Sequence, residues 1–158
     1  MKLLRAFGIS VAILAIGCGP HLIPNLEIEL KDTPDNRALL EVMEKFRQAY
    51  ENLDIDALLA LASDKFYENS GTADTADDYN KDGLRTHFTE HFKLIKKCDL
   101  EISLKDVKVQ GDKATIDYRY VTRYLMALPV GEKWQLTDEI NQMDLAREKG
   151  AWMITSGM

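Results

Sequence analysis

This 158-residue sequence has few cysteines and prolines, two and four respectively. It also lacks an excess of positive charge, because its formal net charge is −6. Two cysteines allow at most one internal disulfide, so the chain is not a small disulfide-stapled scaffold. The negative charge argues against a general nucleic-acid-binding protein, and we expect no nucleic-acid partner. Hydrophobic residues make up 46% of the chain, too many for a disordered protein, and the length suits one ordinary domain.

The short motifs of several enzyme classes are also missing. The sequence contains no G-x-x-x-x-G-K-[ST], G-x-G-x-x-G, G-x-S-x-G or C-x-x-C pattern. Phosphate cradling, dinucleotide binding, serine hydrolysis and thioredoxin chemistry therefore have no local support. We also find no internal repeat.

Long hydrophobic runs are limited to residues 6–16, which are too few for a membrane-spanning helix of about 20 residues. Lys2 and Arg5 precede this run and Gly17-Cys18 follows it, which is the layout of a secretory signal. The segment Leu14-Ala15-Ile16-Gly17-Cys18 resembles the lipobox of bacterial lipoproteins. The resemblance implies a signal peptide over 1–17 and acylation of Cys18. It also implies anchoring to the lipid bilayer of the cell envelope, where we favour the outer over the inner membrane. An ordinary signal peptide with a chance cysteine is the alternative.

Acylation of Cys18 would leave Cys98 without a partner, so we interpret Cys98 as a small buried hydrophobic residue. A disulfide between the two cysteines is the competing interpretation. Residues 18–33 contain prolines and few helix signals. We interpret this segment as a tether between the membrane and the domain.

Helices are predicted in the first half of the remaining chain. Thr33-Pro34-Asp35 is typical of a helix start, with an N-cap, a proline at the first helical position and an acidic first turn. Apolar residues at three- and four-residue steps extend that helix to about residue 52. A short helix from Asp54, a short strand at 64–69, a polar loop at 70–81 and a helix over 82–97 follow.

Strands are predicted in the second half, over 100–109, 114–126, 133–146 and 151–156. Alternation in the second of these places three tyrosines, Tyr118, Tyr120 and Tyr124, on one face. The opposite face is charged and carries Asp117, Arg119 and Arg123. Helices followed by antiparallel strands indicate an α+β fold.

The order of elements over residues 34–158 resembles the nuclear-transport-factor-2-like superfamily, which includes ketosteroid isomerases and polyketide cyclases. The resemblance rests on residues 46–54 with 58–61, on 107–114 and on 148–154. It implies a cone-shaped fold in which helices pack on a curved antiparallel sheet around a cavity. It also implies a homodimer through the outer sheet face, which we expect to be polar. No catalytic residue matches a motif of the superfamily, so none is assigned.

Polar and aromatic side chains on the predicted cavity face are candidates for ligand binding. These candidates are Tyr50, His87, His91, Tyr118, Tyr120, Trp134 and Asp138. Asp138 is the best candidate for a general base, because an aspartate in an apolar cavity can be tuned for proton transfer. The alternative is that the tyrosines are core residues with hydroxyls at the rim.

Two further patterns concern metals. His87-Phe88-Thr89-Glu90-His91 matches the H-x-x-E-H motif of inverted zinc peptidases, but the chain lacks their further carboxylate ligand. We interpret the pattern instead as a helix on which His87 and His91 flank the apolar stripe, with one histidine at the cavity mouth as a hydrogen-bonding group. Asp78, Asn80 and Asp82 match the first half of a calcium-binding loop, whose twelfth position would be Thr89 rather than glutamate. A solvated acidic loop with Asp82 as helix N-cap is the competing interpretation.

We therefore expect a non-enzymatic domain, without a cofactor, that binds a small apolar ligand in the cavity or a protein partner through the sheet. The alternatives are an isomerase, dehydratase or cyclase that uses the same cavity, and a structural component of the envelope. A buried histidine or aspartate within hydrogen-bond reach of a tyrosine in an open cavity would favour the enzyme, and an open cavity without such a pair would favour the binding domain. A cavity filled by side chains would favour the structural component.

Overall fold

Helices come before a four-stranded antiparallel sheet in the computed structural model, which describes residues 21–69 and 75–158. The helices are α1 (Pro34–Glu51), α2 (Ile55–Leu61) and α3 (Lys81–Phe92). The sheet has the order β3-β4-β5-β6, formed by Ile95–Gln110, Lys113–Leu128, Gly131–Glu148 and Ala151–Ser156. This arrangement confirms the predicted α+β class.

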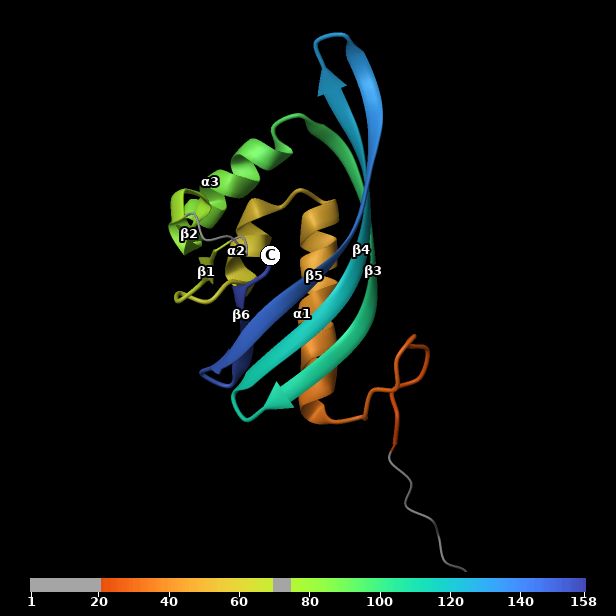
Figure 1. Ribbon diagram of the computed structural model, residues 1–158, viewed down its shortest axis with the longest axis vertical. Helices are drawn as coiled ribbons and strands as arrows, with labels where there is room; N and C mark the ends of the chain where they lie inside the picture. The colour runs from red at the N-terminus through yellow and green to blue at the C-terminus, as the bar shows by residue number, and fades with distance from the viewer. Residues whose placement is uncertain (1–20, 70–74) are drawn as a thin grey trace, which may run out of the picture.

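The long strands β3, β4 and β5 curve around α1, and α3 lies on the same side of the sheet (Figure 1). A small second sheet, β1 (Tyr67–Glu68) with β2 (Tyr79–Asn80), lies beside α3. A 3-10 turn at Thr75–Asp77 precedes β2 within the predicted polar loop. The concave side of the sheet therefore faces the helices, as the predicted cone requires.

Helix α1 begins as predicted. The Thr33 side chain accepts a hydrogen bond from the Asn36 backbone nitrogen at 3.1 Å, and Pro34 is the first helical residue. The predicted apolar stripe is buried at Leu39, Met43 and Phe46. Burial of this stripe against the sheet supplies most of the stability of such a helix.

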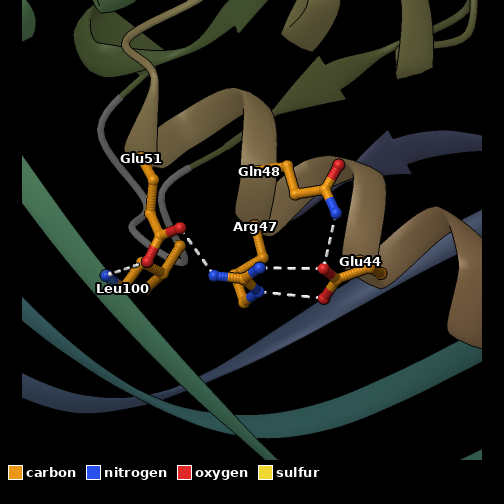
Figure 2. Close-up of polar contacts among 5 residues, drawn as sticks. All are labelled: Glu44, Arg47, Gln48, Glu51 and Leu100. Carbon is orange, nitrogen blue, oxygen red and sulfur yellow. Dashed lines mark hydrogen bonds and ion pairs between the residues drawn. The ribbon is translucent and has the colours of Figure 1, made fainter.

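A carboxylate joins the end of α1 to the edge strand β3 (Figure 2). Glu51 accepts a hydrogen bond from the Leu100 backbone nitrogen at 3.0 Å and an ion-pair contact from Arg47 at 2.6 Å. Arg47 also forms a double contact with Glu44, which lowers the pKa of Glu44 to about 2. The Glu51 carboxylate satisfies the Leu100 N–H at the edge of the sheet, where no further strand pairs with β3. This contact holds α1 in place above the cavity.

The third helix is shorter at its C-terminal end than predicted and starts one residue earlier. It ends at Phe92, and Asn80 rather than Asp82 is its N-cap. Residues 95–97 instead belong to β3, where Ile95 pairs with Met126 and Lys97 with Leu125. A β-bulge between these two pairs separates the buried Ile95 and Cys98 by three residues. This spacing imitates a helical period, which explains the error.

The described part of the predicted tether, residues 21–33, forms a bend that packs on the domain. Ile23 donates a backbone hydrogen bond to Leu30 at 2.8 Å, and Asp32 donates one to His21 at 2.7 Å. Leu30 is buried, and Leu26 and Ile28 pack against the core. Cys18 and the predicted signal peptide over 1–17 lie outside the described residues. Within 21–69 and 75–158, no helix combines the length and the apolar character needed to cross a bilayer.

Candidate functional site

A cavity of about 460 Å³ lies between the concave face of the sheet and helices α1 and α3. The helices contribute Phe46, Tyr50, His87, Phe88 and His91 to its wall. The sheet and the chain end contribute Ile95, Leu100, Tyr118, Tyr120, Thr122, Tyr124, Met126, Gln135, Thr137, Glu139, Asn141 and Met158. This volume is in the range of small-molecule sites. Five predicted ligand-binding residues therefore come together at one cavity: Tyr50, His87, His91, Tyr118 and Tyr120.

Trp134 and Asp138 do not line this cavity, which corrects the prediction for β5. Strand pairing places Thr137 opposite Thr122, so the odd-numbered residues of β5 face the cavity. Asp138 instead forms a double ion pair with Arg119 on the outer face, at 2.7 and 2.5 Å. Asp138 is therefore no longer a candidate base.

Four cavity residues on β5 were missed: Gln135, Thr137, Glu139 and Asn141. Their polar side chains resemble those of a solvent-facing strand, which is why the alternation pointed the other way. A signal was present further along β5, where the apolar Met143 and Leu145 occupy odd positions and are buried. Extending that parity toward the start of the strand places these four residues in the cavity.

A hydrogen-bonded group of two tyrosines and one histidine forms one side of the site. The Tyr50 hydroxyl lies 2.9 Å from His91 Nε2 and 3.0 Å from the Tyr124 hydroxyl. Burial raises the pKa of Tyr50 and of Tyr124, so both are protonated at neutral pH. Burial, and then the neighbouring His87, lower the pKa of His91. A neutral His91 can accept the Tyr50 proton in a hydrogen bond while Tyr50 accepts one from Tyr124.

The remaining hydroxyls of the cavity point to different partners. Tyr120 donates to Glu139 at 2.8 Å, and Tyr118 donates to the Gly157 carbonyl oxygen at 3.2 Å while accepting from Asn141 at 3.1 Å. Burial raises the pKa of Tyr118 to about 12. Thr122 is 1% exposed, and a hydrogen bond from its side chain lowers the pKa of Tyr124 against the larger effect of burial.

The two histidines of the H-x-x-E-H pattern both lie at the cavity wall. Their rings stack with centroids 6.1 Å apart, and His87 also stacks on Tyr79 at 5.0 Å. Burial lowers the pKa of His87 as well. Within residues 21–69 and 75–158, no group of three or more histidine, cysteine, aspartate or glutamate side chains is arranged to hold a metal ion.

The predicted calcium ligands have other partners. Asp78 accepts a hydrogen bond from the Tyr67 hydroxyl. Asn80 caps α3, because its side chain accepts hydrogen bonds from the backbone nitrogens of Asp82 and Gly83 at 3.1 Å each. Asp82 is therefore not the N-cap. Calcium binding by these residues stays a prediction.

The outer face of the sheet is less polar than predicted. On β4 it carries ion-paired arginines, with Arg123 held by Glu101 at 2.8 Å. On β5, however, Trp134, Leu136 and Ile140 are 55%, 62% and 75% exposed. A homodimer through this face stays a prediction, and its β5 half would be apolar.

Comparison with known proteins identifies the fold. No protein-family model matches the sequence, and no curated protein matches it. Among solved structures, a ketosteroid isomerase-like protein from Erwinia carotovora atroseptica is 15% identical, with a TM-score of 0.66 over 79% of this chain and 94% of that one. An NTF-2-like protein of unknown function from Shewanella oneidensis is 14% identical, with a TM-score of 0.59 over 78% of this chain and 96% of that one.

An enzyme is also among the similar structures. A type 2 hexachlorocyclohexane dehydrochlorinase is 12% identical to this chain, with a TM-score of 0.64 over 78% of this chain and 82% of that one. Sequence identities this low indicate that the proteins share a fold but not that they share an activity, because one fold hosts many unrelated functions. The curved sheet, the helices on its concave side and these likenesses agree: the chain has the nuclear-transport-factor-2-like fold.

Proposed function

We propose that this chain is a lipid-anchored protein of the cell envelope that binds a small, largely apolar molecule in the cavity between the sheet and α1. The observation that carries the proposal is the cavity itself, about 460 Å³ in volume and walled mainly by aromatic and aliphatic side chains. Apolar walls favour burial of an apolar ligand, while a few convergent polar groups fix its orientation. A structural component of the envelope would have little use for such an unfilled cavity.

Polar groups that converge at the cavity wall support a ligand with at least one polar group. The hydroxyls of Tyr50 and Tyr124 and the Nε2 atom of His91 lie within hydrogen-bond distance of one another there. A few such groups fix the orientation of a ligand whose body is apolar.

The lipid anchor is supported by the sequence around Cys18. A basic start, a short apolar run and a cysteine at the expected cleavage point are typical of an acylated protein. Several acyl chains on one residue would hold the domain stably at a bilayer. The intact mass of the chain extracted from membranes tests this part, because an unmodified Cys18 would contradict it.

Filling the cavity should abolish ligand binding. Thr137→Trp places an indole in the cavity, whereas Leu136→Trp adds the same group one residue away, on the exposed outer face. With 2-naphthol as a neutral aromatic probe in isothermal titration calorimetry, we expect at least about a tenfold loss of affinity for Thr137→Trp, because the probe loses its apolar contacts. Leu136→Trp should bind like the unaltered chain. Equal affinity in both variants would place the binding elsewhere.

Proton-transfer catalysis is a second candidate function, favoured by the hydrogen bond between Tyr50 and His91. A ligand that enters between the two groups separates them. The neutral histidine can then remove a proton from the ligand, and the Tyr50 hydroxyl, released from His91, can stabilise the oxyanion that develops. The two groups are 2.9 Å apart at the wall of the cavity. An isomerase or dehydratase would need both.

Replacing His91 with glutamine, which has no basic nitrogen, tests catalysis separately from ligand binding. If a bound molecule is converted, His91→Gln should lower kcat by about 100-fold or more while leaving affinity within a few-fold, since general-base catalysis contributes that much. Mass spectrometry of the ligand before and after incubation measures the conversion. Unchanged turnover in His91→Gln would eliminate His91 as the base.

A further inference from the structure

A single carboxylate lies among the described residues of the cavity wall. Among the described residues that line the cavity, Glu139 is the one aspartate, glutamate, lysine or arginine. Lys133, the next residue beyond Gln135 on the same face of β5, does not reach the lining. The whole chain is also negative, with a formal charge of −6, which favours approach of a cation over an anion.

One tyrosine contacts this carboxylate, and a second ring lies next to that tyrosine. Glu139 pairs across the strands with Tyr120, whose hydroxyl donates to it at 2.8 Å. The Tyr118 ring lies next to that of Tyr120, with centroids 6.1 Å apart. The faces of aromatic rings carry negative potential and attract a cation within about 6 Å. Rings and a carboxylate together are the chemistry that recognises an ammonium group.

The two histidines of the cavity wall do not offset the negative charge of Glu139 at neutral pH. Burial lowers the pKa of both His87 and His91, so neither contributes a positive charge. A second carboxylate, Glu68, accepts a hydrogen bond from the backbone nitrogen of Gly157 at 2.7 Å, next in sequence to Met158, which lines the cavity. After burial, the negative charge of Glu68 contributes to the raised pKa of Tyr118.

We propose that the ligand of this cavity is an organic cation, whose ammonium nitrogen lies against Tyr120 beside Glu139. The apolar body extends toward Phe46, Phe88 and Leu100 in the same cavity. An anionic ligand would place its charge beside Glu139 with no lysine or arginine of the described lining to offset it. This inference names the ligand class of the proposed binding function and rests on that function.

Three probes that share a phenyl ring and differ in charge test the inference. They are phenyltrimethylammonium, which is cationic, 2-phenyl-2-propanol, which is neutral and of nearly the same shape, and benzenesulfonate, which is anionic. Isothermal titration calorimetry on the full chain in detergent, with detergent-only blanks subtracted, gives the three affinities. We expect the cation to bind at least about fivefold more tightly than the neutral probe, a difference typical of a partly solvated cation–π site. We expect the anion to bind least.

Two neighbouring residues provide a matched pair of variants. Glu139→Gln removes the carboxylate charge inside the cavity but keeps an oxygen that can accept from Tyr120. Asp138→Asn removes the same charge from the outer face, where Asp138 pairs with Arg119. Glu139→Gln should weaken binding of the cation about fivefold and leave the neutral probe unchanged, because only the cation interacts with that charge. Asp138→Asn should change neither affinity.

The outcomes of these experiments distinguish the inference about the charge of the ligand from the proposed binding function on which it rests. Neutral or anionic binding that equals or exceeds cation binding would overturn the inference and leave the proposed binding function standing. Cation binding that Asp138→Asn weakens as much as Glu139→Gln would also overturn it, since the effect would then come from overall charge. If Thr137→Trp leaves binding of all three probes intact, the cavity is not the site, and the proposed function itself fails.

Discussion

Replacing Phe88 with alanine is expected to lower the free energy of unfolding by about 3–5 kcal/mol, the usual cost of deleting a buried aromatic ring. Phe88 is 1% exposed. Its ring stacks on Phe92 with centroids 5.3 Å apart and meets the edge of Tyr50 at 6.1 Å. The same ring forms part of the cavity wall, so its loss should also enlarge the ligand site. Urea denaturation followed by circular dichroism measures the change.

Two comparisons make the Phe88 result specific. Phe88→Leu keeps most of the buried volume and should cost less than Phe88→Ala, because much of the penalty comes from the space left empty. Thr86→Ala changes an exposed residue of the same helix and should stay within about 0.5 kcal/mol of the unaltered chain. A loss below about 1 kcal/mol for Phe88→Ala would show that Phe88 is not packed as described.

The Gly157→Ala variant should lose about 2–4 kcal/mol, from backbone strain and crowding together. Gly157 has a φ of +80°, and a Cβ there would lie 1.9 Å from the Gln142 carbonyl oxygen. Its backbone nitrogen and oxygen are both used, by Glu68 at 2.7 Å and Tyr118 at 3.2 Å. Relief of the clash requires movement of the chain end, so the Tyr118 hydroxyl should lose its hydrogen bond to the Gly157 carbonyl oxygen.

Gly150→Ala separates the strain from the crowding at Gly157. Gly150 has a similar φ of +86°, but a Cβ there would meet nothing within 4 Å. This control should therefore cost only about 1–2 kcal/mol, the penalty for a left-handed conformation alone. Thermal and urea unfolding of both variants give the difference. Equal losses in the two variants would mean that the contact with Gln142 contributes nothing.

Short-range patterns in the sequence determined much of the fold. The cap at Thr33, the proline at position 34 and the stripe of Leu39, Met43 and Phe46 specify α1, because caps and helical periodicity act within a few residues. The alternation of β4 likewise places its tyrosines on one face. The resemblance of the element order to the nuclear-transport-factor-2-like superfamily then supplied the curved sheet and the cavity, which the structure confirms.

Only the tertiary structure decided which residues of β5 and α3 belong to the site. Trp134 and Asp138 share one face of β5, but pairing of Thr137 with Thr122 turns that face outward and brings Glu139 into the cavity. The bulge after Ile95 imitates a helical spacing beyond Phe92, where α3 ends. Strand register and bulges depend on partners far along the chain, so local periodicity cannot determine them. The sequence by itself determined the elements and the likeness to a known fold, and the contacts between strands decided the chemistry of the cavity.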